Sequence, residues 1–255
     1  MNGLRTEANP LLFSTITSYI STPLRALPGT LREGPEDSLL RLSASHPQRS
    51  SRQRLLRMLI HSAASPATLA RLYTIWRDRS EPLLNETDYT DLAYSLAVRL
   101  PDRSDSIVRT QRARLTDPDR IRRFDFISRA MTPDTAALDT LFRSLLIPEN
   151  RRIEPWTSAL LGWLNHPTRE RHAVRYIRPA LDALRDVQRT GDIFFPRDWV
   201  GALLRNHRSP EAYRALLDFI DANPGYPPLL LNKVWQAAYP LYRANGEVEE
   251  VENEK

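Results

Sequence analysis

Residues 65–76 read Ser-Pro-Ala-Thr-Leu-Ala-Arg-Leu-Tyr-Thr-Ile-Trp, and the rest of the chain repeats the features of this stretch. The Ser65 side chain can accept a hydrogen bond from an unpaired amide of a helix's first turn. Pro66 suits the first helical position because it has no N–H to leave unpaired. Leu69, Leu72 and Trp76 then fall on one helical face. The stretch predicts a capped, amphipathic helix.

The same start signal recurs along the chain. Prolines stand about one helix length apart from Pro66 to Pro227, and several follow a capping residue, as in Asp117-Pro118, Thr132-Pro133 and Ser209-Pro210. Apolar residues at helical spacing fill the intervals, and no segment alternates as a strand would. The sequence therefore predicts an all-α fold. Short capped turns favour antiparallel neighbours, stacked in a curved array like HEAT or armadillo repeats.

The 255 residues are enough for one large domain or two small ones. Residues 1–51 are expected to form a short helix near Leu11 to Ile20 and then a loose connector from Thr22 to Ser51, which is rich in Pro, Gly and Ser. Residues 52–245 form the predicted helical-repeat domain. Residues 246–255 are acidic and poor in apolar residues, which predicts a disordered tail.

The composition limits the classes of function. The net charge is +5, but acidic residues interrupt even the densest basic cluster, between Arg112 and Arg123, so we expect no nucleic-acid partner. With no cysteine, disulfides, thiol nucleophiles and cysteine metal sites are excluded. No apolar run is long enough to span a membrane and no signal peptide is visible, which leaves the compartment open.

No motif for catalysis or metal binding is present. The five histidines lack metal-ligand spacing, and the run from His166 to Glu170 departs from H-E-x-x-H. His166 is expected to end a helix and to hydrogen-bond the backbone there. We therefore assign no catalytic residue, no metal ligand and no cofactor to this chain.

Residues 146–199 stand apart from a plain helical repeat. They contain Trp156, Trp163 and Trp199, adjacent Phe194 and Phe195 on a turn, and short polar runs. Tryptophan beside arginine on loops marks a contact surface, whereas tryptophan between helices marks a core, and the sequence leaves both interpretations open.

Ordered phrases within residues 69–243 resemble the helical C-terminal region of M1-family zinc aminopeptidases, in the form found in a group of bacterial members. The phrases include Arg71-Leu-Tyr-Thr-Ile-Trp76, Glu149-Asn-Arg151, Glu154-Pro-Trp156, Leu164-Asn-His-Pro167 and Gln188-Arg-Thr-Gly-Asp-Ile-Phe-Phe-Pro196. No single phrase is diagnostic, and the resemblance rests on their number and order.

The resemblance implies a bowl-like stack of helices that packs on a catalytic domain and helps to enclose the chamber where peptides lose their N-terminal residue. Zinc is implied for that parent domain, because this chain has neither the H-E-x-x-H helix nor the G-x-M-E-N loop. The implied partners are the catalytic domain and the peptide substrate, in the cytoplasm or the periplasm.

If the chain lines that chamber, polar and cationic residues are expected to contact the peptide or the catalytic domain. These candidate contacts are Glu149, Asn150, Arg151, Arg152, Trp156, His166, Arg178 and Asp192. The alternative is a free-standing helical-repeat scaffold that binds a protein partner, with nucleic acid as the less favoured ligand.

Overall fold

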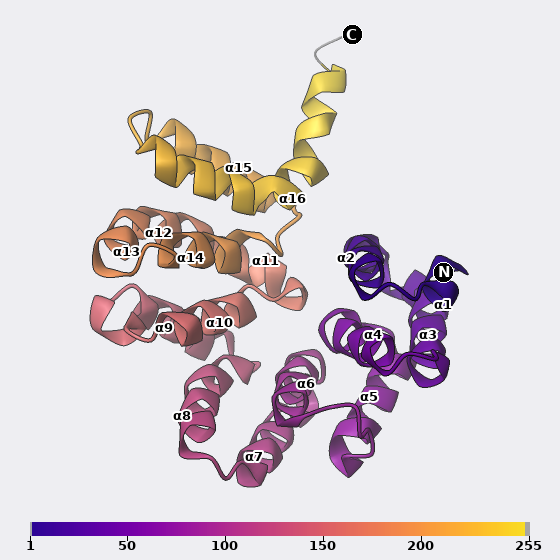
Figure 1. Ribbon diagram of the computed structural model, residues 1–255. Helices are drawn as coiled ribbons and strands as arrows, with labels where there is room; N and C mark the ends of the chain where they lie inside the picture. Colours follow the sequence, from indigo (N-terminus) through magenta and orange to yellow (C-terminus); the bar gives the residue numbers. More distant parts are fainter. Residues whose placement is uncertain (1, 253–255) are drawn as a thin grey trace. The chain divides into compact units, whose positions relative to one another are not determined.

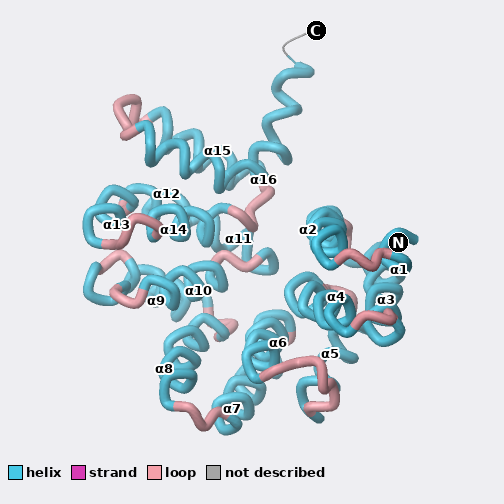
Figure 2. The backbone as a smooth tube through the Cα atoms, in the orientation of Figure 1, coloured by secondary structure: helices cyan, strands magenta, loops and turns pink. Residues whose placement is uncertain are grey.

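The computed structural model describes residues 2–252, and every regular element within them is a helix (Figure 1; Figure 2). The predicted all-α class is confirmed. The helices form two compact units, one ending at Arg114 and the other beginning at Leu115. No helix in this described range is long and apolar enough to cross a membrane.

The first unit is built around α4. On it pack α2, α3 and α6, while α5 contacts α3 and α6, and α7 contacts α6. Leu39, Leu55 and Leu59 are fully buried between these helices. The elements are α1 (Asn2–Thr6), α2 (Pro10–Ala26), α3 (Gly29–Ser45), α4 (Arg49–Ser62), α5 (Pro66–Asp78), α6 (Glu86–Arg99), the 3₁₀ turn η1 (Pro101–Arg103) and α7 (Ser104–Arg114).

Most of the segment from Thr22 to Ser51 is helical, so the loose connector predicted there is wrong. Pro23 lies inside α2 and Pro35 inside α3, although a proline in a helix interior costs about 3 kcal/mol. Burial outweighs this cost, because Leu24, Leu39 and Leu42 enter the core of the unit. Each fully buried leucine contributes about 1.5–3 kcal/mol.

A buried carboxylate joins α3 to the start of α5. Glu36 is fully buried, and its oxygens accept hydrogen bonds from the amide of Ala64 at 2.9 Å and the amide of Ser65 at 3.0 Å. The Ser65 hydroxyl donates to Glu36 at 2.6 Å and accepts from the Thr68 amide at 3.4 Å. The start of α5 at Pro66 is confirmed, and the N-terminal segment stabilises it.

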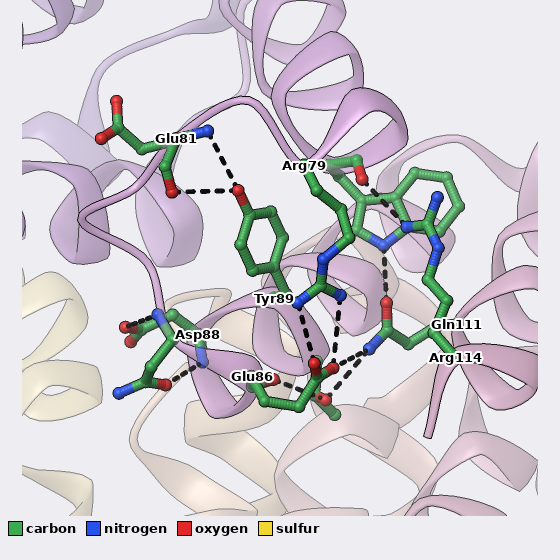
Figure 3. Close-up of polar contacts among 10 residues, drawn as sticks. Arg79, Glu81, Glu86, Asp88, Tyr89, Gln111 and Arg114 are labelled. Carbon is green, nitrogen blue, oxygen red and sulfur yellow. Dashed lines mark hydrogen bonds and ion pairs between the residues drawn. The ribbon is translucent and has the colours of Figure 1, made fainter. Parts of the chain in front are cut away.

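The helices α5, α6 and α7 meet at a polar cluster around Gln111 (Figure 3). The Trp76 indole N–H donates to Gln111 Oε1 at 3.0 Å, and Gln111 Nε2 donates to Glu86 Oε1 at 3.0 Å. Glu86 also pairs with Arg79 at 2.8 Å, and the Arg79 guanidinium carbon lies 4.3 Å from the Tyr89 ring centre. Among the described residues other than glycine, only Arg79 has a positive φ, 49°, at the end of α5.

The second unit stacks its helices in two layers (Figure 1). In one layer α14 lies between α10 and α16, and in the other α12 packs on α15. The elements are α8 (Pro118–Ile127), η2 (Ser128–Met131), α9 (Thr135–Leu145), η3 (Pro148–Arg151), α10 (Glu154–Leu164), η4 (Pro167–Arg169), α11 (Glu170–Ala173), η5 (Val174–Tyr176), α12 (Ile177–Asp182), α13 (Leu184–Thr190), α14 (Phe195–Leu204), α15 (Pro210–Asp221) and α16 (Pro228–Glu252).

Two of the predicted helix starts in this unit are confirmed and one is displaced. Asp117 caps α8 by accepting from the Arg120 amide at 2.9 Å, and Ser209 caps α15. The start predicted at Thr132 is wrong by two residues, because Asp134 accepts from the Ala136 amide and takes the capping position instead.

The boundary after Arg114 falls inside the segment predicted to be one domain, residues 52–245. At the other end, α16 continues to Glu252, within the segment predicted to be a disordered tail. Residues 253–255 of that tail lie outside the described residues. The curvature predicted for the whole array stays a prediction.

Candidate functional site

Arg151 is buried inside the second unit, with 2% of its surface exposed. Its Nη1 donates to the carbonyl of Leu146 at 2.9 Å and to that of Leu145 at 3.4 Å. Its Nη2 pairs with Asp186 and donates to the Thr190 hydroxyl at 3.2 Å. The guanidinium therefore joins the α9–α10 turn to α13 within the chain, and the contact with a peptide or a catalytic domain expected of Arg151 stays a prediction.

Asp186 also forms an ion pair with a second arginine, Arg189, which is exposed. Arg189 donates to Asp186 at 2.6 Å, and the hydrogen bonds from Arg189 and Arg151 lower the pKa of the Asp186 carboxyl below its usual value. The carboxylate therefore stays charged under ordinary conditions and keeps the buried guanidinium of Arg151 paired.

Asp192 organises the next turn, between α13 and α14. Its amide donates to Glu154 Oε1 at 2.9 Å, which connects this turn to the start of α10. Its carboxylate accepts from the amides of Phe194 at 2.7 Å and Phe195 at 2.9 Å. Asp192 is exposed, but its carboxylate already binds the backbone at the start of α14.

The remaining polar candidates of the α9–α10 turn are on the surface. Asn150 donates to the Ser144 carbonyl at 3.1 Å. Glu149 and Arg152 are exposed, and their side chains have no hydrogen bond or ion pair with other described residues. Of the eight predicted residues, these two charges are the most available to a partner.

His166 is 7% exposed and occupies the turn predicted for it at the end of α10. Its Nδ1 accepts a hydrogen bond from the Thr168 amide at 3.3 Å, and its ring stacks on Trp163 with centroids 5.6 Å apart. The expectation that His166 bonds the backbone is confirmed. The contact with a peptide or a catalytic domain that was also expected of His166 stays a prediction, and little of the ring is exposed for it.

Trp156 and Arg178 lie apart from the two turns. Trp156 is half-buried on α10, with its ring 5.9 Å from that of Phe126. Arg178 is exposed on α12 and pairs with Asp182 at 3.0 Å. The structure therefore joins the turn that carries residues 149–152 to the turn that carries Asp192, and it does not bring the whole predicted set together.

The predicted set missed three exposed isoleucines on the same turns, while Phe194, which the sequence placed on a turn, is exposed as well. Ile147 is 50% exposed, Ile153 47%, Ile193 81% and Phe194 60%. We call residues 146–153 and 191–194 the turn edge. Arg151 and the bond from Asp192 to Glu154 hold its two turns beside each other. The sequence signal that could have revealed them is the pair Ile147 and Ile153, which flank the polar run from Pro148 to Arg152.

A polar network lies elsewhere in this unit, between α9 and α11. Asp139 accepts from His172 Nε2 at 2.7 Å and from the Tyr176 hydroxyl at 2.7 Å, and pairs with Arg175 at 3.3 Å. Burial raises the pKa of Asp139, but the hydrogen bonds from Tyr176 and His172 outweigh it and the pKa is lowered. Burial and the bond to Asp139 raise the pKa of Tyr176, so its hydroxyl is a donor and no nucleophile.

Within residues 2–252 no group of three or more His, Asp or Glu side chains is placed to hold a metal ion. Comparisons of the chain with protein-family models, with curated proteins and with solved structures find no match.

Proposed function

We propose that this chain is a non-catalytic helical domain that packs on the catalytic domain of an M1-family zinc aminopeptidase and helps to enclose its peptide chamber. The ordered phrases within residues 69–243 are the basis of the proposal. The all-α class and the stacked helices of the second unit are compatible with the architecture that the resemblance implies.

The observation that carries the proposal is the turn edge. Four large apolar side chains are exposed there within the phrase where the resemblance is densest. Exposed apolar side chains that gather on one surface mark a protein contact. The buried guanidinium of Arg151 fixes the turns in the free protein, so less conformational entropy is lost when a partner binds. Glu149 and Arg152 supply unpaired charges at the rim.

The charges of the second unit favour a protein partner over nucleic acid. Arginines on its surface pair with neighbouring acids, as Arg122 does with Asp119, Arg178 with Asp182 and Arg197 with Asp198. Such pairing neutralises the positive charge that a phosphate backbone requires.

The absence of catalysis is tested on the purified chain. After loading with Zn²⁺ and dialysis, we expect it to retain no stoichiometric zinc and to release no nitroaniline from alanyl-p-nitroanilide. Amino-acid release by a pure, metal-loaded sample, proportional to protein concentration, contradicts the proposal.

The docking surface is tested with the parent's H-E-x-x-H domain in a binding assay. Ile193→Ser combined with Phe194→Ser is expected to weaken the complex at least tenfold, because buried apolar anchors dominate interface energies. Leu12→Ser, at a residue of the first unit that is 53% exposed, is the matched control. Equal affinity of the two variants rules out the turn edge as the interface. Failure of the wild-type chain to bind that domain leaves the free-standing scaffold as the function.

A further inference from the structure

A groove of about 460 Å³ lies in the first unit between α2 and α4. One wall is the α4 face that carries Arg54, Arg57 and Met58, and the other is the α2 face that carries Phe13, Thr17 and Ser21. No Asp or Glu lines it. The groove therefore combines positive charge, hydroxyl groups and apolar side chains, and no acidic side chain is among its lining residues.

Both arginines are oriented by bonds at one edge of the guanidinium. Arg57 binds Asp88 through Nε at 2.7 Å and Nη2 at 3.1 Å. Arg54 binds the Thr17 hydroxyl through Nε at 2.7 Å and the Ser14 carbonyl through Nη2 at 3.2 Å. The Nη1 groups of both arginines have no acceptor within the described residues. Two donors, one helical turn apart, are thus available to a ligand.

The net charge of the groove indicates the charge of the ligand. Asp88 neutralises Arg57, whereas Arg54 has no acidic partner among the described residues. The arginines of the groove, taken with Asp88, therefore carry one unbalanced positive charge, which suits a monovalent anion. Arginine binds carboxylates through charge-assisted hydrogen bonds. Met58, which is half-buried on α4, offers an apolar surface beside that charge.

We propose that this groove binds an organic carboxylate that carries an apolar group. The carboxylate accepts hydrogen bonds from Nη1 of Arg54 and Nη1 of Arg57, and the apolar group packs against Met58. Because the locked guanidinium groups are already placed, little side-chain entropy is lost on binding. This inference concerns the first unit alone and does not depend on the proposed function.

The test is calorimetric titration of the full chain with 3-phenylpropionate, using neutral 3-phenylpropanamide as the matched ligand. We expect saturable binding of the acid, at least tenfold weaker binding of the amide, and a loss of at least tenfold in Arg54→Gln, which removes one charged donor. Arg41→Gln is the control, because Arg41 is exposed on α3 and pairs with Asp37. It should bind like the wild type.

Circular dichroism establishes that the Arg54→Gln chain is folded, and Arg54→Lys, which restores the charge, should recover part of the affinity. No saturable binding of the acid, equal binding of the amide, or unchanged affinity in folded Arg54→Gln overturns the proposal. Displacement of the acid by inorganic phosphate at equal concentration also overturns the proposal, because the site would then bind small anions without recognising an apolar group.

Discussion

The adjacent arginines Arg151 and Arg152 are expected to contribute very different amounts to stability. Arg151 is 2% exposed and donates hydrogen bonds to two carbonyls, a hydroxyl and a carboxylate, whereas the exposed Arg152 side chain makes no such bond to the described residues. A hydrogen bond from a charged group contributes about 1.5–3 kcal/mol, and a buried carbonyl left without a donor costs about 1–3 kcal/mol. Replacing the two arginines one at a time therefore separates a buried role from an exposed one.

Two features reduce the loss of stability expected for Arg151→Ala. Asp186 keeps its bond to Arg189 and is 32% exposed, so water can solvate it. The Arg151 Nε is buried with no acceptor in the described part of the chain, so its removal relieves a cost already present. We expect Arg151→Ala to lower the free energy of unfolding of the second unit by about 3 kcal/mol, and Arg152→Ala by less than about 0.5 kcal/mol.

The assay is urea denaturation followed by tryptophan fluorescence. Of the five tryptophans, Trp156, Trp163, Trp199 and Trp235 lie in the second unit, so the signal reports mainly on that unit. With a slope of about 2 kcal/mol per M, the midpoint for Arg151→Ala should fall by about 1.5 M. Midpoints of the two variants within about 0.3 M of each other would refute the assignment of Arg151 to the interior.

Two other predictions concern single residues. Burial lowers the pKa of His207 to about 4, below the value of 6.5 expected in the unfolded chain, with Glu170 opposing the shift and Arg208 adding to it. The unfolded chain therefore takes up a proton at a higher pH than the folded chain does. The contribution of neutral His207 to stability is complete above pH 6.5, and about 3 kcal/mol of it is lost as the pH falls through 4. Urea midpoints at pH 7 and pH 4 should differ less in His207→Gln than in the wild type, and an unchanged difference would exclude His207 as the cause. At Arg79, with φ of 49°, glycine relieves backbone strain of about 1 kcal/mol that alanine retains. Arg79→Gly should therefore be about 1 kcal/mol more stable than Arg79→Ala in thermal unfolding, although both lose the pair with Glu86; the opposite order would contradict the role of strain.

Local signals predicted those parts of the fold that neighbouring residues determine. The starts of α5, α8 and α15 follow from Ser65, Asp117 and Ser209, because a cap acts on amides two or three residues away. The connector predicted from Thr22 to Ser51 is wrong because the burial of Leu24, Leu39 and Leu42, which outweighs the prolines there, depends on tertiary packing.

The candidate site was less predictable because its chemistry depends on distant residues. Arg151 and Arg152 are equivalent in sequence, and the partners that distinguish the buried one include Asp186 and Thr190, more than 30 positions later. The predicted polar set also omitted Ile147, Ile153 and Ile193, since apolar residues are ordinarily assigned to the core. Their exposure became visible only with the turns in place.

Whether this sequence belongs to a zinc aminopeptidase is decided by the mass and peptide map of the native polypeptide that contains it, isolated from its source cells with an antibody to the chain. We expect either a polypeptide well above 29.4 kDa whose peptides include an H-E-x-x-H segment, or this chain in a stoichiometric complex with such a polypeptide. A 29.4 kDa polypeptide with no zinc peptidase bound to it would contradict the proposed function.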